Sequence, residues 1–324
     1  MDRVLVTGTH GIVGRWVTRK LREEGSTVIG VDRKDEPADV DEHYTCNILN
    51  RERLTNIVQE SSPDALVHLA ARTDLDETED LDGYAANIEG VRNVVGAVRA
   101  SSSVRRAIYT SSQLVCRIGY VPESETDYCP DTLYGESKVQ TERIVRGEEG
   151  GGVPWCIVRP TTVWGPHMKP HYQKMIRYIE KGLYFHVGYD DLYKSYSYAG
   201  NVAHQYYKIL TVPEENINEK TLYLADYEPL SLKKYAEKIQ EELGARPIPK
   251  CPLPVARLLA KAGDLLNWLG WKQFPFNSFR LRNILTEYVY DMEETKKICG
   301  PLPYGFDEGI KQTVKWYISE KDNL

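Results

Sequence analysis

Three side chains of this sequence could transfer a proton together, namely Ser112, Tyr134 and Lys138. Tyr134 and Lys138 are four residues apart in a segment with helical spacing, so they share one helix face. A nearby ammonium stabilises a phenolate, and Lys138 would therefore lower the pKa of Tyr134 towards the range of a general acid-base catalyst. Ser112 follows an apolar run, and a hydroxyl at the carboxyl end of a parallel strand could bind the same substrate oxygen. The trio predicts acid-base chemistry at a hydroxyl or carbonyl group.

A glycine-rich turn near the N-terminus could hold a phosphate. Gly8, Gly11 and Gly14 lie between the apolar run 4–6 and a helical pattern. Glycines at these places allow a tight turn and a close approach of the backbone to a pyrophosphate, which a helix N-terminus attracts. Such turns also occur for structural reasons alone, but the next apolar run ends in Asp32, whose carboxylate can accept hydrogen bonds from an adenosine ribose. Together these features predict a dinucleotide site.

The residues around Asp32 bear on the choice between NAD and NADP. Asp32 would repel a ribose 2′-phosphate, which favours NAD, whereas Arg33 and Lys34 could accommodate that phosphate. We expect NAD, with NADP as the alternative.

Short apolar runs alternate with helical patterns through the first half of the chain. The expected strands are 4–6, 28–31, 65–67, 107–109 and 155–158, and the expected helices are 12–24, 51–60, 87–101 and 134–146. This alternation predicts an α/β fold of the Rossmann type, a doubly wound parallel sheet.

The alternation decays after residue 165. We expect residues 1–165 to form the NAD(P)-binding domain and residues 166–324 a smaller, mostly helical substrate-binding domain, interleaved with the first because 194–226 returns to its sheet. Within that return, 195–199 and 221–225 are the expected strands. Helices are expected at 231–243, with Ser231 as the cap, and at 307–318.

The composition limits the classes of partner and location. A net charge of -6 disfavours nucleic acid and anionic membranes as partners. Six scattered cysteines without metal-ligand spacing favour reduced thiols, a cytoplasmic location and no metal site. The apolar stretch 254–271 is interrupted by Arg257, Lys261 and Asp264, which indicates a surface or substrate-lining helix rather than a membrane span.

Five ordered motifs resemble those of the extended short-chain dehydrogenases/reductases, specifically the NAD-dependent epimerase/dehydratase family, over nearly the whole chain. The motifs are Thr7-Gly8-x-x-Gly11-x-x-Gly14, His68-Leu69-Ala70-Ala71, Ser111-Ser112, Tyr134-x-x-x-Lys138 and Arg159-Pro160. The resemblance implies that Tyr134 is the acid/base, that Lys138 binds the nicotinamide ribose, and that Ser112 polarises the reacting oxygen. It also implies a homodimer that pairs the helices near 87–101 and 134–146.

The resemblance further implies a set of cofactor contacts. Besides Tyr134 and Lys138, these are Gly8, Gly11, Ile12, Val13, Gly14, Asp32, Arg33, Asn47, Ile48, Leu69, Ala70, Ala71, Asn87, Pro160 and Thr162. Asn47 stands where the family commonly has an acidic residue, which weakens one expected contact with adenine.

Where 4,6-dehydratases of this family have an Asp-Glu pair, this sequence has Gln113-Leu114. The resemblance therefore implies hydride transfer without elimination, either epimerisation or net oxidation or reduction. The expected small-molecule substrate is a nucleotide-diphosphate sugar, since Lys169, His171, Tyr172, Lys174 and Arg177 follow the family's substrate segment. The expected substrate contacts are Ser112, Gln113, Thr162, His171, Tyr172 and His186.

Two alternatives remain open. One is an oxidoreductase similar to 3β-hydroxysteroid dehydrogenases, favoured by Gly200-Asn201 and by 258–271 as an apolar surface for a hydrophobic alcohol. The other is a dinucleotide-binding sensor without catalysis, which the intact Ser112, Tyr134 and Lys138 disfavour.

Overall fold

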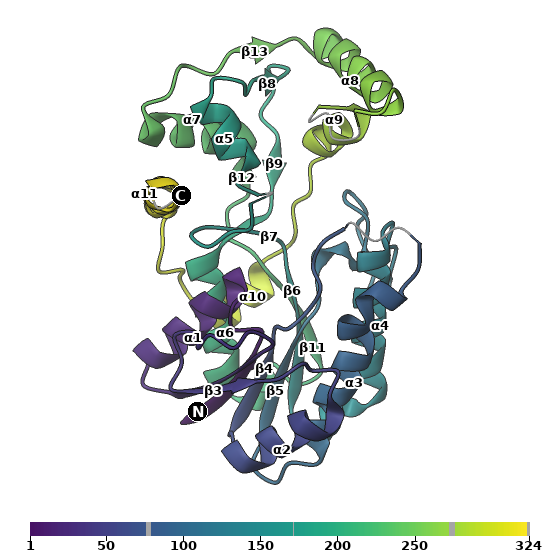
Figure 1. Cartoon of the computed structure of the whole chain (residues 1–324), viewed down its shortest axis with the longest axis vertical. Coiled ribbons are helices and arrows are strands. Elements are labelled where there is room, and N and C mark those ends of the chain that lie inside the picture. The colour runs from purple at the N-terminus through teal and green to yellow at the C-terminus, as the bar shows by residue number, and fades with distance from the viewer. Residues whose placement is uncertain (76–78, 171, 272–275, 323–324) are drawn as a thin grey trace. The chain divides into compact units, whose positions relative to one another are not determined.

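The computed structural model describes residues 1–75, 79–170, 172–271 and 276–322. Their contacts divide the chain into two compact units (Figure 1). The first unit comprises Met1–Val163, Ser197–Tyr227 and Asp291–Tyr304, and the second comprises Trp164–Tyr196, Glu228–Tyr290 and Gly305–Leu324. The chain thus passes between the units several times.

A seven-stranded parallel sheet forms the centre of the first unit, with the order β11-β6-β5-β4-β1-β2-β3. Its strands are β1 (Arg3–Thr7), β2 (Thr27–Asp32), β3 (Glu42–Thr45), β4 (Ala65–His68), β5 (Arg106–Thr110), β6 (Trp155–Pro160) and β11 (Lys220–Leu224). The Rossmann-type fold predicted from the alternating pattern is confirmed. The edge strand β3 was not predicted, because its partly exposed sequence Glu-His-Tyr-Thr contains no apolar run.

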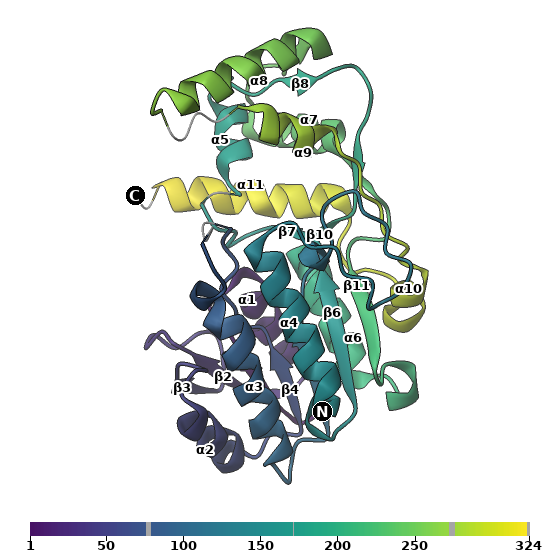
Figure 2. The same ribbon diagram turned by 90° about the vertical axis from the view of Figure 1, so that its right-hand side faces the viewer.

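Helices cover both faces of this sheet, and Figure 2 shows α3 and α4 side by side on one of them. One face packs against α2 (Arg51–Ser61), α3 (Ala85–Arg99) and α4 (Leu133–Gly147), and the other against α1 (Ile12–Glu23), α6 (Ala199–Thr211) and α10 (Glu293–Cys299). Because side chains alternate along a strand, Leu5 is buried in one of these layers and its neighbour Val6 in the other. Burial on both faces explains why the strands are apolar runs rather than alternating patterns.

One of the two expected returning strands does not join the large sheet. The segment 221–225 does so as β11, beside β6. The segment 195–199 instead contributes β10 (Tyr196–Tyr198), which pairs with β7 (Thr162–Trp164) in a separate two-stranded sheet. The physical reason is local: α6 begins at Ala199, so the strand ends after three residues, and β11 occupies the place beside β6.

The second unit is mostly helical. It contains α5 (Lys174–Glu180), α7 (Leu232–Leu243), α8 (Leu253–Trp268), α9 (Ser278–Leu285) and α11 (Phe306–Asp322), with the short strands β8 (His186–Val187), β9 (Tyr193–Lys194), β12 (Leu230–Ser231) and β13 (Lys250–Cys251). Helix α7 contacts both α5 and α11, and α8 packs on α9. Ser231 caps α7 as predicted, because its hydroxyl oxygen accepts a hydrogen bond from the Lys234 amide at 3.1 Å.

Candidate active site

Helix α4 carries both Tyr134 and Lys138 and is fixed at its N-terminus by a capping bond. The Thr132 hydroxyl oxygen accepts a hydrogen bond from the Gly135 amide at 3.0 Å. One turn further on, the Lys138 ammonium donates a 2.9 Å hydrogen bond to the main-chain carbonyl oxygen of Thr110, the last residue of β5. The structure therefore places the ammonium at the carboxyl end of a central strand, where open α/β sheets bind their ligands.

Burial governs the charge of Lys138. The residue is only 2% exposed, and this desolvation lowers the pKa of its ammonium to about 8, while the carboxylate of Glu142 acts in the opposite direction. Near neutral pH the ammonium is therefore still mostly charged. A cation held at this place would stabilise a phenolate one helical turn away.

Ser112 follows β5 directly and caps the short 3-10 turn η2 (Gln113–Val115). Its hydroxyl oxygen accepts a hydrogen bond from the Leu114 amide at 3.1 Å, a bond that uses a lone pair and not the hydroxyl proton. Tyr134 is nearly buried, and its ring lies beside that of Tyr84 with 6.0 Å between the centroids. The structure thus brings Ser112 and Lys138 to one strand end, and Tyr134 lies one turn before Lys138 on the same helix.

The glycine-rich turn is pressed against the end of β4. Gly8 has a φ of +78°, and a Cβ atom built on it would lie 2.7 Å from the Ala70 amide nitrogen. The Thr7 hydroxyl oxygen accepts hydrogen bonds from the Leu69 and Ala70 amides at 3.1 and 3.2 Å. These contacts leave no room for a larger residue at position 8, and they fix the segment after β4 against the turn.

The N-terminus of α1 has the features of an anion site. Its cap residue is Gly11, no side chain caps the helix, and its first turn has no acidic residue. Apart from the adjacent residues, the one described atom within 4 Å of a Cβ atom built on Gly11 is the Gly8 carbonyl oxygen, at 3.4 Å. The amides of the first turn and the space in front of Gly11 could therefore receive a pyrophosphate.

Asp32 ends β2 and contacts the same turn. Its carboxylate accepts hydrogen bonds from the amides of His10 and Lys34 at 3.1 and 3.2 Å, and the His10 Nδ1 atom lies 3.3 Å away. Burial raises the pKa of this carboxyl, but these hydrogen bonds outweigh burial and hold the pKa below its usual value. The bond to His10 was not foreseen, since no sequence pattern links that residue to Asp32.

Several expected cofactor contacts have protein partners in the structure. The Asn87 amide group donates to the Arg72 carbonyl and to the Ser137 hydroxyl, and accepts from the Arg72 amide, each at 2.9 Å. Asn87 therefore holds the segment after β4 against α4. Ile48 is buried in the core, while Asn47 is exposed. A direct contact between these three residues and a cofactor stays a prediction.

The expected substrate contacts are distributed over both units. Gln113 and Thr162 belong to the first unit, and Tyr172 and His186 to the second. His186 is buried in β8, with its Nε2 atom 3.8 Å from a Glu237 carboxylate oxygen, and burial lowers the pKa of its imidazole. His171 lies outside the described residues.

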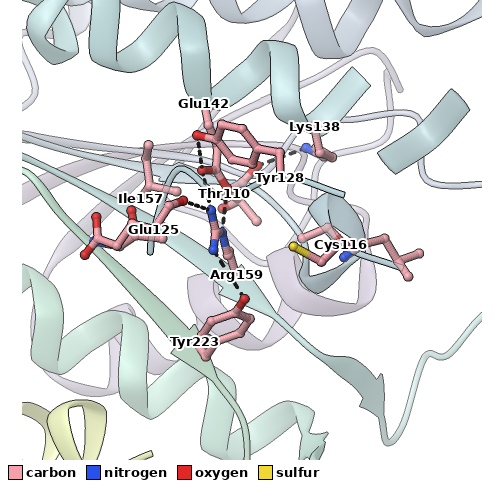
Figure 3. A network of polar contacts seen from close by, with 12 residues as sticks. Thr110, Cys116, Glu125, Tyr128, Lys138, Glu142, Ile157, Arg159 and Tyr223 are labelled. Atoms are coloured by element: carbon pink, nitrogen blue, oxygen red, sulfur yellow. Dashed lines mark hydrogen bonds and ion pairs between the residues drawn. The ribbon is translucent and has the colours of Figure 1, made fainter. Parts of the chain in front are cut away.

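A buried ion pair joins α4, the helix of Tyr134 and Lys138, to the sheet, as Figure 3 shows. The Arg159 guanidinium on β6 donates to both carboxylate oxygens of Glu142 on α4, at 2.7 and 2.8 Å. Tyr128 donates to the same carboxylate at 3.0 Å, and Arg159 also donates to the Tyr223 hydroxyl at 3.2 Å. Glu142 is one turn beyond Lys138, so this pair fixes the helix face that carries Tyr134. Sequence reasoning noted Arg159 only as part of a motif and missed Glu142.

The family model described as "NAD dependent epimerase/dehydratase family" matches residues 4–224. The chain belongs to this family. Its cofactor is accordingly NAD, and the resemblance predicted from the motifs is confirmed.

Two curated relatives illustrate the range of activities around this family member. A 3-beta-hydroxysteroid dehydrogenase of Mycolicibacterium neoaurum is 29% identical over 84% of this chain and 78% of the relative. An N-acetyl-alpha-D-glucosaminyl-diphospho-ditrans,octacis-undecaprenol 4-epimerase of Escherichia coli O157:H7 is 25% identical over 81% of this chain and 80% of the relative.

Solved structures show the same fold. A UDP-glucose 4-epimerase of Thermotoga maritima aligns with a TM-score of 0.75 at 19% identity over 98% of this chain and 99% of that one. A UDP-glucose 4-epimerase of Thermus thermophilus in complex with NAD aligns with a TM-score of 0.73 at 21% identity, over the same shares of the two chains. At these identities the likeness concerns the fold alone.

Proposed function

We propose that this family member transfers a hydride between NAD and a secondary alcohol or ketone, with Tyr134 as the acid/base. The observation that carries this proposal is the buried Lys138 ammonium at the carboxyl end of β5, one helical turn from Tyr134 and close in sequence to Ser112. NAD supplies the hydride chemistry. In the oxidation direction, the Tyr134 phenolate accepts the proton of the substrate hydroxyl as the carbonyl forms.

Ser112 and Lys138 complete the proton transfer. The Ser112 hydroxyl donates to the reacting oxygen and so stabilises the negative charge that develops on it. The Lys138 ammonium favours the phenolate form of Tyr134. The hydrogen bond to the Thr110 carbonyl oxygen keeps the ammonium in place. With Gln113-Leu114 in place of an acidic pair, no carboxylate beside Ser112 is available for elimination.

The cofactor would bind with its pyrophosphate against the glycine-rich turn. The amides at the N-terminus of α1 would bind the pyrophosphate, and the ionised Asp32 would accept hydrogen bonds from the adenosine ribose. The attachment of Asp32 to His10 would couple ribose binding to the position of the turn.

For the substrate we now place a hydrophobic alcohol or ketone ahead of a nucleotide-diphosphate sugar. The steroid dehydrogenase is 29% identical over 84% of this chain, and the epimerase of a diphosphoundecaprenol-linked sugar is 25% identical over 81% of it, so sequence similarity supports the first class by a small margin. The buried Asn201 side chain donates a 2.8 Å hydrogen bond to the Asp226 carboxylate. The Gly200-Asn201 pair therefore has a structural role and does not distinguish the two substrate classes.

The acid/base role is tested with Tyr134→Phe, which keeps the ring and removes the hydroxyl. NADH binding, followed by fluorescence, should stay within about twofold of wild type while turnover falls by at least about a hundredfold. Tyr84→Phe, a matched change in the neighbouring ring, should keep most of its turnover. Unchanged turnover in Tyr134→Phe would refute the mechanism.

The substrate class is tested by thermal stabilisation in the presence of NAD. One panel contains sterols and long-chain secondary alcohols, and the other contains UDP-, GDP-, CDP- and dTDP-sugars. A compound that binds the folded state raises Tm with concentration, and we expect this from the first panel. Stabilisation by a nucleotide sugar alone would reverse the order of the two classes, and an isolated keto product or epimer would then identify the reaction.

A further inference from the structure

Helix α8 exposes an apolar stripe on the side opposite its packed face. Its packed face is made by Ala256 and Ala260, which contact Leu281 of α9. Apolar residues spaced by three and four positions follow the other side of the helix, namely Val255, Leu258, Ala262, Leu265 and Leu269. A helix on the surface of a globular protein normally has polar residues there. Leu258 is 69% exposed, so this stripe faces away from the unit that carries it.

Aromatic side chains extend the exposed apolar surface at one end of the hairpin formed by α8 and α9. Trp268 is 81% exposed at the last residue of α8, and Trp271 and Phe279 are more than half exposed. Tryptophan is enriched where proteins meet the boundary between lipid and water, because its ring is apolar and its N–H is polar. The position of these rings beside the leucines is typical of a helix that lies in that boundary.

The charge of the hairpin is opposite in sign to that of the chain. Residues 253–285 contain five Lys or Arg residues and one Asp, while the whole chain has a net charge of -6. The single acid, Asp264, accepts a hydrogen bond from the Ser278 amide at the start of α9 at 3.1 Å. Arg257 and Lys261 are exposed, and Lys261 lies one helical turn from both Leu258 and Leu265. The apolar stripe is therefore flanked by cations.

We propose that the paired helices α8 and α9 bind the surface of an anionic lipid bilayer, with α8 parallel to it. Among the described residues, none of the helices combines the length and the hydropathy that a transmembrane span requires. An amphipathic helix with cations beside an apolar stripe instead binds in the headgroup region, through burial of the stripe and attraction of the cations. The net charge of the chain argued against such a partner, but the hairpin carries a local positive charge.

A second copy of this chain fits the same surface less well. Pairing two identical faces would bring Arg257 and Lys261 of one copy towards the same cations of the other, with Asp264 already hydrogen-bonded inside its own hairpin. Like charges held close together oppose association. An anionic lipid surface complements both the cations and the apolar stripe.

The test is flotation of the full chain with lipid vesicles. One set contains equal parts of phosphatidylcholine and phosphatidylglycerol, and the other contains phosphatidylcholine alone. We expect wild type to float with the anionic set at low salt and much less with the neutral set. The double variant Leu258→Glu/Leu265→Glu should remain in the soluble fraction. Leu183→Glu, a change at an exposed leucine of the same unit outside the hairpin, should float like wild type.

A second variant separates charge from apolar burial. Arg257→Gln/Lys261→Gln keeps the leucines and should weaken vesicle binding by at least about tenfold, because each cation near an anionic surface contributes a several-fold factor. Every variant should retain the rise in Tm that NAD causes in wild type, which shows that the first unit is folded. The assay needs no substrate, so its result is independent of the function proposed above.

Two results would overturn the proposal. In one, wild type stays in the soluble fraction with anionic vesicles. In the other, light scattering shows that wild type is an oligomer and that Leu258→Glu/Leu265→Glu is a smaller species, while wild type and the double variant float to the same extent. That second result would assign the stripe to an interface between copies of this chain.

Discussion

The Lys138 ammonium donates a 2.9 Å hydrogen bond to the carbonyl oxygen of Thr110, and this bond ties the helix that carries Tyr134 to the end of β5. The bond satisfies a main-chain acceptor with a buried cation. It therefore sets the position of the helix that carries the proposed acid/base, and it places a positive charge at the end of the strand.

Stability should depend on pH through Lys138. Burial lowers the pKa of its ammonium from 10.5 to about 8, so between these values the unfolded chain binds more protons than the folded one. The free energy of unfolding must therefore rise as the pH increases from about 8 to 10.5. Below about pH 8 the folded state bears the full cost of burying the charged ammonium.

The comparison that isolates this effect is wild type against Lys138→Met. We expect the difference in free energy of unfolding between them to shift in favour of wild type as the pH rises from about 8 to 10.5. Urea denaturation at several pH values measures this shift. Lys174→Met, a change at an exposed lysine, is measured in parallel as the control. A flat difference for Lys138→Met would contradict the burial argument.

Breaking the pair between Arg159 and Glu142 should destabilise the fold more than removing both partners. Arg159→Met leaves the fully buried Glu142 carboxylate without its guanidinium, at a cost of about 3–5 kcal/mol. Adding Glu142→Leu removes that unpaired charge and should recover much of the loss. Urea denaturation of Arg159→Met, Glu142→Leu and the double variant gives the free energies of unfolding from which the coupling energy between the two side chains is calculated. Strictly additive effects would show that the pair does not act as a unit.

Gly11→Ala should separate folding from cofactor binding. The backbone at Gly11 has a φ of -69°, which alanine adopts easily, and the methyl group would meet only the Gly8 carbonyl oxygen at an ordinary 3.4 Å. We expect a Tm close to wild type and NADH binding weakened by at least about tenfold, because the methyl group would occupy the space proposed for the pyrophosphate.

The matched control for that prediction is Gly96→Ala in α3. Apart from the adjacent residues and the helix's own backbone, no described atom lies within 4 Å of the added methyl group there, and alanine favours a helix over glycine by about 1 kcal/mol. This variant should bind NADH like wild type with an equal or higher Tm. If Gly11→Ala also binds normally, the pyrophosphate does not approach this turn.

Replacing Asp32 should change the preference between cofactors. Asp32→Ala removes the proposed ribose acceptor and the negative charge that would repel a 2′-phosphate. We expect NADH affinity to fall by about tenfold or more, with NADPH affinity unchanged or higher. Titration of each cofactor by fluorescence measures both. Glu36→Ala, an exposed acid on the following segment, should leave both affinities unaltered.

The parts of the fold that follow from local pattern were predictable. The apolar strands and the glycine turn after β1 depend on residues that are close together in the sequence. The same holds for Tyr134 and Lys138, which are four residues apart. The edge strand β3 was not predictable in this way, since its residues are only partly buried. Strand signals depend on burial, and burial is incomplete at an edge.

The supporting contacts of the site could not be predicted, for two physical reasons. The acceptor for Lys138 is a main-chain carbonyl, a group that every residue carries. Glu142 and Arg159 are 17 positions apart on different elements, and their pairing depends on how α4 packs on the sheet. A single sequence without that packing gives no reason to join them.

The division of the first unit into three stretches of chain constrains the order in which it can form during synthesis. The outer edge of β6 pairs with β11, which is synthesised some 60 residues later. Helix α10 can join the unit only after Asp291–Tyr304 has been synthesised. A nascent or truncated chain that ends near residue 163 would expose that edge, and exposed edges of apolar strands invite pairing with other chains. The first unit should therefore be expressed together with the rest of this chain, because residues up to about 163 form only part of its sheet.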